Sequence, residues 1–98
     1  MIKEHNISTK IHPTAIIHPD SVIGSEVEIG PFSIVEENCV IGDRTKIYEH
    51  VTIKTFSTIG KECEIFQGAV IGGIPQDLKF GGEKSKLIIG DRTRVREY

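Results

Sequence analysis

The stretch IGGIPQDLKFGGEKSKLIIG, residues 71–90, concentrates the side chains that are best suited to bind a ligand. Within it, Gln76, Asp77 and Lys79 stand close together in the sequence. A carboxylate accepts hydrogen bonds from hydroxyl groups, and an ammonium group meets phosphate as a compact charge. These residue types can therefore form hydrogen bonds and ion pairs with a ligand, but a solvated polar loop without a function has the same composition.

A repeat of six residues governs the chain on both sides of this stretch. Every sixth residue from Ile11 to Ile71 is Ile or Val, and Ile89 and Val95 resume the same phase. The residue two positions earlier is small, most often Ser, Thr, Cys or Ala. Neither a helix nor a flat strand has this period, whereas short strands that turn a corner every six residues do. We predict an all-β fold, a parallel β-helix of triangular section, in preference to a set of antiparallel strands.

Two details of the repeat lead to further expectations. Glycine often follows the aliphatic residue, as at Gly24, Gly42 and Gly60, and we expect it to relieve backbone strain at the corners. Three sides give a coil of eighteen residues, so residues eighteen apart should stack on neighbouring coils. The charges support this register, because they alternate in sign along two columns, Glu26, Arg44, Glu62 and Glu28, Lys46, Glu64.

One side of the predicted coil carries outward apolar residues. They are Ile16, Ile34 and Val70, with Phe32 stacked over His50 and Tyr48 beside Phe66. A continuous outward row of this kind is a candidate interface, so we predict a homo-oligomer packed through this side. The alternative is a set of scattered surface apolar residues.

The cysteines and histidines do not suggest a catalytic or metal-binding group. Cys39 and Cys63 occupy the small inward position, which indicates buried packing residues on different sides of the coil. His12, His18 and His50 do not share one stacked column, so three histidine ligands for zinc are not expected to converge. No Ser-His-Asp or Cys-His arrangement can be recognised.

Composition and length favour one cytoplasmic domain. The 98 residues carry a net charge of -2 with mixed signs, and no basic excess indicates nucleic acid. No apolar run has the length of a membrane span or a signal peptide. Residues 1–10 read as a lead-in segment and 11–98 as the β-helix. Residues 73–86 read as a loop, because Asp77 and Glu83 would otherwise occupy inward aliphatic positions.

Four motifs resemble a known family: IHPTAIIHPDSVIG, IGPFSIV, IGGIPQDLKFGGE and IGDRTRVRE. Over residues 11–98 the chain looks like the N-terminal part of the acyl-[acyl-carrier-protein]–UDP-N-acetylglucosamine O-acyltransferases of lipid A biosynthesis. The hexapeptide repeat is shared with acetyltransferases and γ-type carbonic anhydrases, whereas the QDLK stretch followed by IGDRTRVRE is much more specific. The resemblance implies a left-handed coil, a homotrimer and a site in the cleft between subunits.

The resemblance also implies roles for individual residues. Asp77 would hydrogen-bond the sugar of UDP-N-acetylglucosamine, Gln76 would help to position substrate or acyl chain, and Lys79 would lie near phosphate. Acyl carrier protein would deliver the 3-hydroxyacyl chain, and no cofactor is implied. The family's general base is a histidine on a later coil, beyond Tyr98, and no histidine here matches it. We therefore expect part of an acyltransferase that is inactive alone; the alternative is a non-catalytic oligomerising β-helix.

Overall fold

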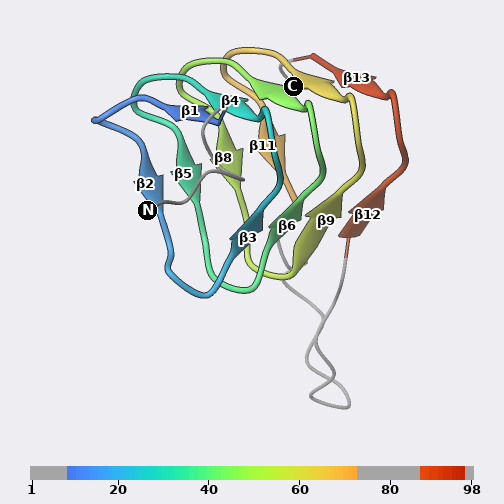
Figure 1. Ribbon diagram of the computed structural model, residues 1–98, viewed down its shortest axis with the longest axis horizontal. Helices are drawn as coiled ribbons and strands as arrows, with labels where there is room; N and C mark the ends of the chain where they lie inside the picture. The colour runs from blue at the N-terminus through green and yellow to red at the C-terminus, as the bar shows by residue number, and fades with distance from the viewer. Residues whose placement is uncertain (1–8, 73–86, 97–98) are drawn as a thin grey trace.

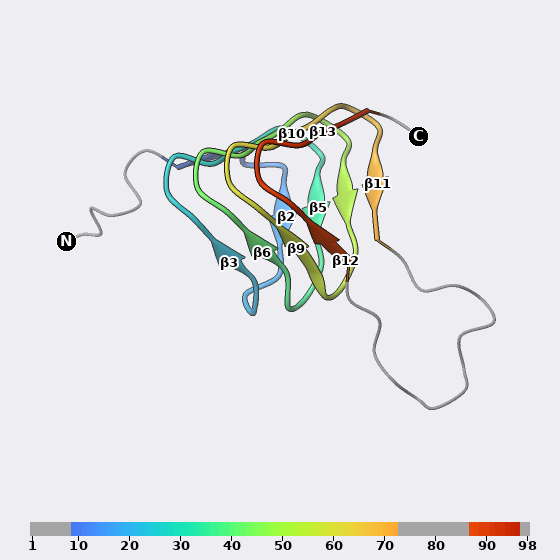
Figure 2. The ribbon, with the colours of Figure 1, turned by 90° about the vertical axis from the view of Figure 1, so that its right-hand side faces the viewer.

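The structure, a computed structural model, describes residues 9–72 and 87–96. Short strands wind around a common axis and form the three walls of a triangular prism (Figures 1 and 2). Sheet A contains β1 (Lys10–Ile11), β4 (Glu28–Ile29), β7 (Lys46–Ile47), β10 (Glu64–Ile65) and β13 (Arg94–Val95). Sheet B contains β2 (Ile16–Ile17), β5 (Ile34–Val35), β8 (Thr52–Ile53) and β11 (Val70–Ile71). Sheet C contains β3 (Val22–Ile23), β6 (Val40–Ile41), β9 (Ser57–Ile59) and β12 (Leu87–Ile89).

All three sheets are parallel, and successive strands of the chain belong to successive sheets. The predicted parallel β-helix is thereby confirmed, and its coil is left-handed. The predicted register is also confirmed, because Glu28 pairs with Lys46, and Lys46 pairs with Glu64. The predicted lead-in 1–10, except for its last two residues, and the predicted loop 73–86 lie outside the described residues.

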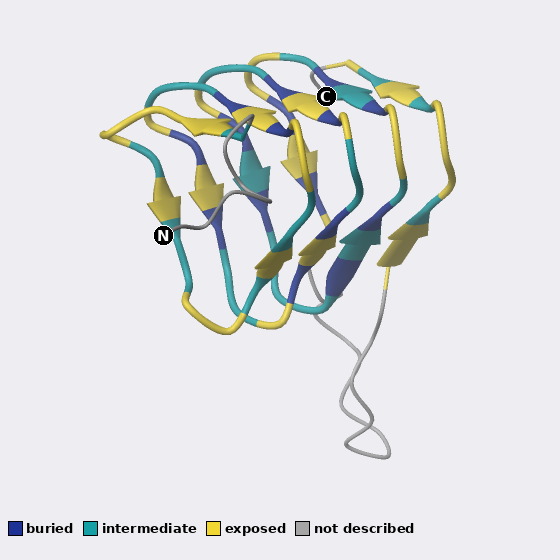
Figure 3. Cartoon of the chain, viewed as in Figure 1, coloured by how far each residue is buried: buried dark blue, intermediate teal, exposed yellow. Residues whose placement is uncertain are grey.

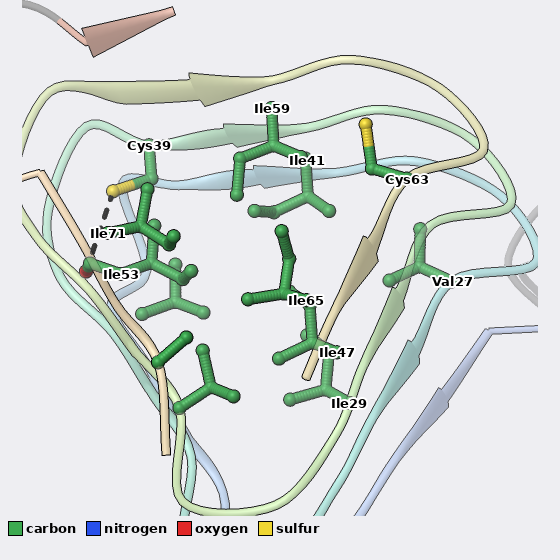
Figure 4. Packing of buried hydrophobic residues seen from close by; sticks show 13 residues of the cluster. Val27, Ile29, Cys39, Ile41, Ile47, Ile53, Ile59, Cys63, Ile65 and Ile71 are labelled. Carbon is green, nitrogen blue, oxygen red and sulfur yellow. Dashed lines mark hydrogen bonds between the residues drawn. The ribbon is translucent and has the colours of Figure 1, made fainter. Parts of the chain in front are cut away.

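The core is a set of stacked aliphatic columns inside the prism (Figure 4). The side chains of Ile41, Ile47, Ile53, Ile59 and Ile65 are at most 1% exposed. Within each strand from β4 to β8 the second residue is buried and the first faces outward, which is the alternation visible in Figure 3. Burial of each isoleucine contributes about 1.5–3 kcal/mol, so these columns are the main source of stability.

The small inward residues also form hydrogen bonds with the backbone, which was not predicted from the sequence. Ser33 Oγ donates to the carbonyl of Tyr48 at 2.7 Å and accepts from the amide of Val51 at 3.1 Å. Thr45 Oγ1 donates to the carbonyl of Gly60 at 2.8 Å and accepts from the amide of Cys63 at 3.1 Å. Each hydroxyl therefore joins two backbone groups of the next coil that face the apolar interior.

The two cysteines are fully buried and unpaired with each other, as predicted. Their thiols follow the same pattern as the hydroxyls. Cys39 Sγ donates to the carbonyl of Lys54, and Cys63 Sγ donates to that of Gly90, each at 3.1 Å. A thiol is a weak donor, so these contacts are weaker than the donor contacts of the serine and threonine hydroxyls.

The expectation that glycine relieves strain at the corners is wrong at most positions. Left-handed backbone occurs three residues after the aliphatic residue, where φ is 57–65° at Glu26, Phe32, Asn38, Arg44, His50, Phe56, Glu62 and Arg92. Of the glycines that follow an aliphatic residue, Gly72 has positive φ. Gly24, Gly30, Gly42 and Gly60 are required by close approach, whereas Gly90 is not; a Cβ on Gly42, for example, would lie 2.5 Å from the carbonyl carbon of Gly60 on the next coil.

The charged columns form the expected contacts on the outside of the prism. Arg44 Nε lies 3.0 Å from Glu62 Oε2, and Lys46 Nζ lies 3.8 Å from Glu28 Oε1. These side chains are about half exposed, so each pair contributes at most about 1 kcal/mol. Asp43 behaves differently, because its carboxylate accepts from the amide of Ser25 at 2.9 Å and holds a corner of the preceding coil.

Candidate functional site

The predicted site residues Gln76, Asp77 and Lys79 lie outside the described residues, but the strands on either side locate their segment. Strand β11 ends in sheet B, and β12 begins in sheet C at Leu87. Leu87 pairs with Ser57, thirty residues earlier, whereas Val40 pairs with Thr58, eighteen residues later. The chain therefore inserts twelve extra residues where sheet B turns into sheet C, which we name the B–C corner.

A polar network holds the B–C corner of the coil that precedes the insertion. The two carboxylate oxygens of Glu36 are both occupied by groups of the next coil. Oε1 accepts from the Thr55 amide at 3.1 Å and from the Thr55 hydroxyl at 3.2 Å. Oε2 accepts from Lys54 Nζ at 3.3 Å. Hydrogen bonds to a charged acceptor are stronger than those to a neutral one, so Glu36 fixes residues 54 and 55 against its own coil.

These contacts set the ionisation of Glu36. Burial raises its pKa, but the Thr55 amide and the Lys54 ammonium lower it by more together, and the pKa of the carboxyl lies below the ordinary value of 4.5. The charged carboxylate is thus the form that the folded chain prefers. Its contribution to stability is complete above the unfolded-state pKa and is lost as the pH falls through the lowered folded-state pKa.

This shift predicts how acid acts on the protein. Between about pH 7 and about pH 3, the free energy of unfolding should fall more in the wild type than in Glu36→Gln, because the amide cannot be protonated in this range. Urea unfolding at a series of pH values measures this difference. Glu37→Gln removes a carboxylate one residue away and should retain the wild-type dependence. Equal pH profiles for the wild type and Glu36→Gln would contradict the assignment.

An apolar groove of about 400 Å³ lies beside this network. Its walls are formed by neighbouring coils of sheet B and of the B–C corner: Ile16, Ile17, His18, Pro19, Ile34, Val35, Glu36, Glu37 and Thr55. The groove is open and mostly apolar, with the Glu36 carboxylate among its polar groups. It lies over strands β2 and β5, at the end of sheet B away from β11, after which the inserted residues leave the coil.

Sheets B and C both carry exposed apolar residues on their outward faces. On sheet B, Ile16, Ile34 and Val70 are 62%, 37% and 63% exposed, and Phe32 stacks on His50 with ring centroids 5.2 Å apart. Tyr48 and Phe66 also stack, at 5.0 Å, as expected. A second row of exposed apolar residues, on sheet C, was not predicted from the sequence. Its residues Val22, Val40 and Ile88 are 60%, 41% and 71% exposed. Testing the outward position of every side at the eighteen-residue period would have revealed it.

The histidines within the described residues are engaged locally. His12 Nδ1 and His18 Nδ1 each accept from the backbone amide two residues later, at 3.1 Å. No group of three or more His, Cys, Asp or Glu side chains that could hold a metal ion occurs in residues 9–72 and 87–96. The same residues contain no helix with the length and hydropathy needed to cross a membrane.

Part of the chain is similar to bacterial hexapeptide-repeat transferases. Residues 20–55 match the bacterial transferase hexapeptide family (six repeats). The chain is 44% identical over 89 residues to the acyl-[acyl-carrier-protein]–UDP-N-acetylglucosamine O-acyltransferase of Thermodesulfovibrio yellowstonii, an alignment that covers 91% of this chain and 34% of that protein.

Solved structures agree with the sequence comparison. LpxA from Acinetobacter baumannii matches with a TM-score of 0.83 and 47% identity, over 89% of this chain and 34% of its own. LpxA from Bacteroides fragilis, a UDP-N-acetylglucosamine acyltransferase, matches with a TM-score of 0.81 and 53% identity, over 87% and 33%. The chain thus spans about a third of the length of these relatives. It is a left-handed β-helix of hexapeptide repeats that is similar to the UDP-N-acetylglucosamine O-acyltransferases over that third, as its motifs indicated.

Proposed function

We propose that the chain is part of an O-acyltransferase of lipid A biosynthesis. The enzyme moves a 3-hydroxyacyl chain from acyl carrier protein to the 3-hydroxyl of UDP-N-acetylglucosamine, and this part supplies contacts to the sugar nucleotide. The observation that carries the proposal is the identity of 44% over 89 residues with an enzyme whose name states these two substrates. The working compartment is the cytoplasm, where acyl carrier protein and the sugar nucleotide are both available.

In this proposal the substrate contacts come from the segment inserted at the B–C corner. Asp77 accepts from sugar hydroxyls, Lys79 lies near phosphate, and Gln76 positions substrate or acyl chain. The insertion is flanked on both sides by regular strands of the coil, β11 and β12. Loops held by a rigid scaffold are common places for binding residues.

The general base is not assigned to any residue of this chain. Within the described residues, His50 is stacked on Phe32 at the corner between sheets A and B, and His12 and His18 accept hydrogen bonds from their own corners. We propose that none of these three is the base that removes the proton from the sugar. We propose that the 98-residue chain alone binds the sugar nucleotide but does not transfer the acyl group.

A binding measurement on matched variants tests the assignment of Asp77. Isothermal titration with UDP-N-acetylglucosamine should give a Kd for Asp77→Asn at least about tenfold above that of the wild type, because a carboxylate–hydroxyl contact is lost. Glu83→Gln removes the other carboxylate of the segment and should leave the Kd nearly unchanged. Failure of the wild type to bind, or transfer by the wild type above a control without enzyme, would contradict the proposal.

A second candidate function is a non-catalytic module that oligomerises. The observation in its favour is the pair of outward apolar rows on sheets B and C. A closed ring of three copies uses two different patches of each chain, and these rows supply two. The homotrimer belongs to both candidates, so binding of UDP-N-acetylglucosamine distinguishes them.

The predicted trimer has its own test. Sedimentation equilibrium should give three times the monomer mass of 10.9 kDa for the wild type. Val70→Lys should shift the protein toward the monomer, because an unpaired charge would be buried in the interface. Ser25→Lys adds the same charge at an exposed corner and should leave the trimer intact. A monomeric wild type, or an unaffected Val70→Lys, would refute this interface.

A further inference from the structure

We propose that Glu36 is a positioning residue for substrate binding, because its carboxylate fixes the corner 54–57 on which the backbone at Gly72 and Leu87 rests. This inference rests on the proposed function, in which residues 73–86 carry the contacts to the sugar nucleotide. Glu36 itself does not touch substrate in this scheme. It acts through the backbone of the next coil, and its side chain is only about one third exposed.

Glu36 holds the corner 54–57 through both oxygens of its carboxylate. Its Oε1 accepts from the amide and the hydroxyl of Thr55, and its Oε2 accepts from Lys54 Nζ. The amide of Glu36 donates to the carbonyl of Ile53 at 2.9 Å, so main chain and side chain bind the same part of the next coil. Bonds to the amide of Thr55 restrain backbone, which a contact between side chains alone would not do.

Gly72 and Leu87, the residues on either side of 73–86, both contact the corner 54–57. The amide of Lys54 donates to the carbonyl of Ile71 at 2.8 Å. A Cβ on Gly72 would lie 2.6 Å from Ser57 Oγ and 3.3 Å from Lys54 Cβ, so the outgoing backbone rests directly on the corner. The returning backbone meets the same corner, because the amide of Leu87 donates to the carbonyl of Phe56 at 3.4 Å.

A hydrogen bond inside the corner links its first and last residues. Ser57 Oγ donates to the carbonyl of Lys54 at 2.8 Å and closes residues 54–57 into one unit. Carboxylates fix corner amides elsewhere in this chain, since Asp43 accepts from Ser25 and Asp91 accepts from Lys61. Glu36 applies a similar device to corner 54–57, on which Gly72 and Leu87 rest. A displacement of this corner would therefore move Gly72 and Leu87, the described residues on either side of 73–86, together.

Two measurements on one set of variants test the inference. The Kd for UDP-N-acetylglucosamine should rise about tenfold in Glu36→Ala and less in Glu36→Gln, whose amide oxygen can still accept from Thr55. Amide hydrogen exchange should become about tenfold faster at Thr55 and Leu87 in Glu36→Ala. The amide of Lys46, in sheet A, should exchange at the wild-type rate. Glu37→Gln is the matched control and should change neither quantity.

The outcomes separate this inference from the proposed function. Unchanged exchange at both Thr55 and Leu87 in Glu36→Ala overturns the inference, whether or not the nucleotide binds. An unchanged Kd in Glu36→Ala, with a wild type that binds, also overturns it. If the wild type does not bind the nucleotide, the proposed function fails, and faster exchange confined to Thr55 and Leu87 still supports the hold of Glu36 on the corner. Faster exchange throughout sheet A would show general destabilisation and would overturn the positioning role.

Discussion

Replacement of Gly42 by alanine is expected to destabilise the protein by about 3 kcal/mol or more, because the new methyl group would meet backbone. The Cβ would lie 2.5 Å from the carbonyl carbon and 2.6 Å from the carbonyl oxygen of Gly60. Neither atom can move by a change of rotamer, so the two coils would have to separate. For a domain of this size the melting temperature should fall by roughly 12 °C or more, measured by thermal unfolding.

Gly90 provides the control at the same position of the repeat. Among the described residues, nothing lies within 4 Å of a Cβ built on Gly90, and its φ is not positive. Gly90→Ala should therefore be neutral or stabilising by up to about 1 kcal/mol, because alanine reduces the entropy of the unfolded chain. Similar losses of stability at both positions would show that close approach of the coils is not the reason for glycine.

Replacement of Thr45 by valine is the second large effect, and we expect it to cost about 2–4 kcal/mol. The side chain is fully buried, and valine keeps its shape. The change leaves the carbonyl of Gly60 without the hydroxyl donor and the amide of Cys63 without the hydroxyl acceptor. A buried polar group without a partner costs about 1–3 kcal/mol, and two such groups are created. Urea unfolding measures the change.

Thr58→Val is the matched control, because it makes the same chemical change on the outer face of strand β9. Thr58 stands between Val40 and Ile88 in the register of sheet C. Valine there extends an existing apolar row and is well suited to a strand, so stability should change by less than about 0.5 kcal/mol. A small loss in Thr45→Val would mean that the buried hydroxyl only fills space.

The sequence was sufficient to predict the fold because one period determines it. Eleven consecutive aliphatic positions at a spacing of six leave few other structures, and the charges at Glu28, Lys46 and Glu64 supply the register. The stacking of Phe32 on His50 followed from the same register. These features depend on which residues repeat, and a repeat is visible in the sequence.

Other features depend on atoms that a residue type does not specify. The reason for glycine at Gly42 is the distance to the next coil, which the sequence does not contain. The hydroxyl bridges of Ser33 and Thr45 need the direction of each Oγ relative to the next backbone. Glu36 was missed because its partners, Lys54 and Thr55, become neighbours only when the B–C corner forms. Residues 76, 77 and 79 stay predictions.

The spacing of the strand pairs also bears on how the chain reaches this structure. Ordinary pairs close loops of eighteen residues, and the pairs that cross the insertion close loops of thirty. The entropic penalty of loop closure grows only with the logarithm of length, so the longer loop adds about 0.5 kcal/mol. The last coil can therefore add to the growing stack at nearly the same cost as any other. A change in the number of residues inserted at the B–C corner should therefore alter the stability of the last coil only slightly.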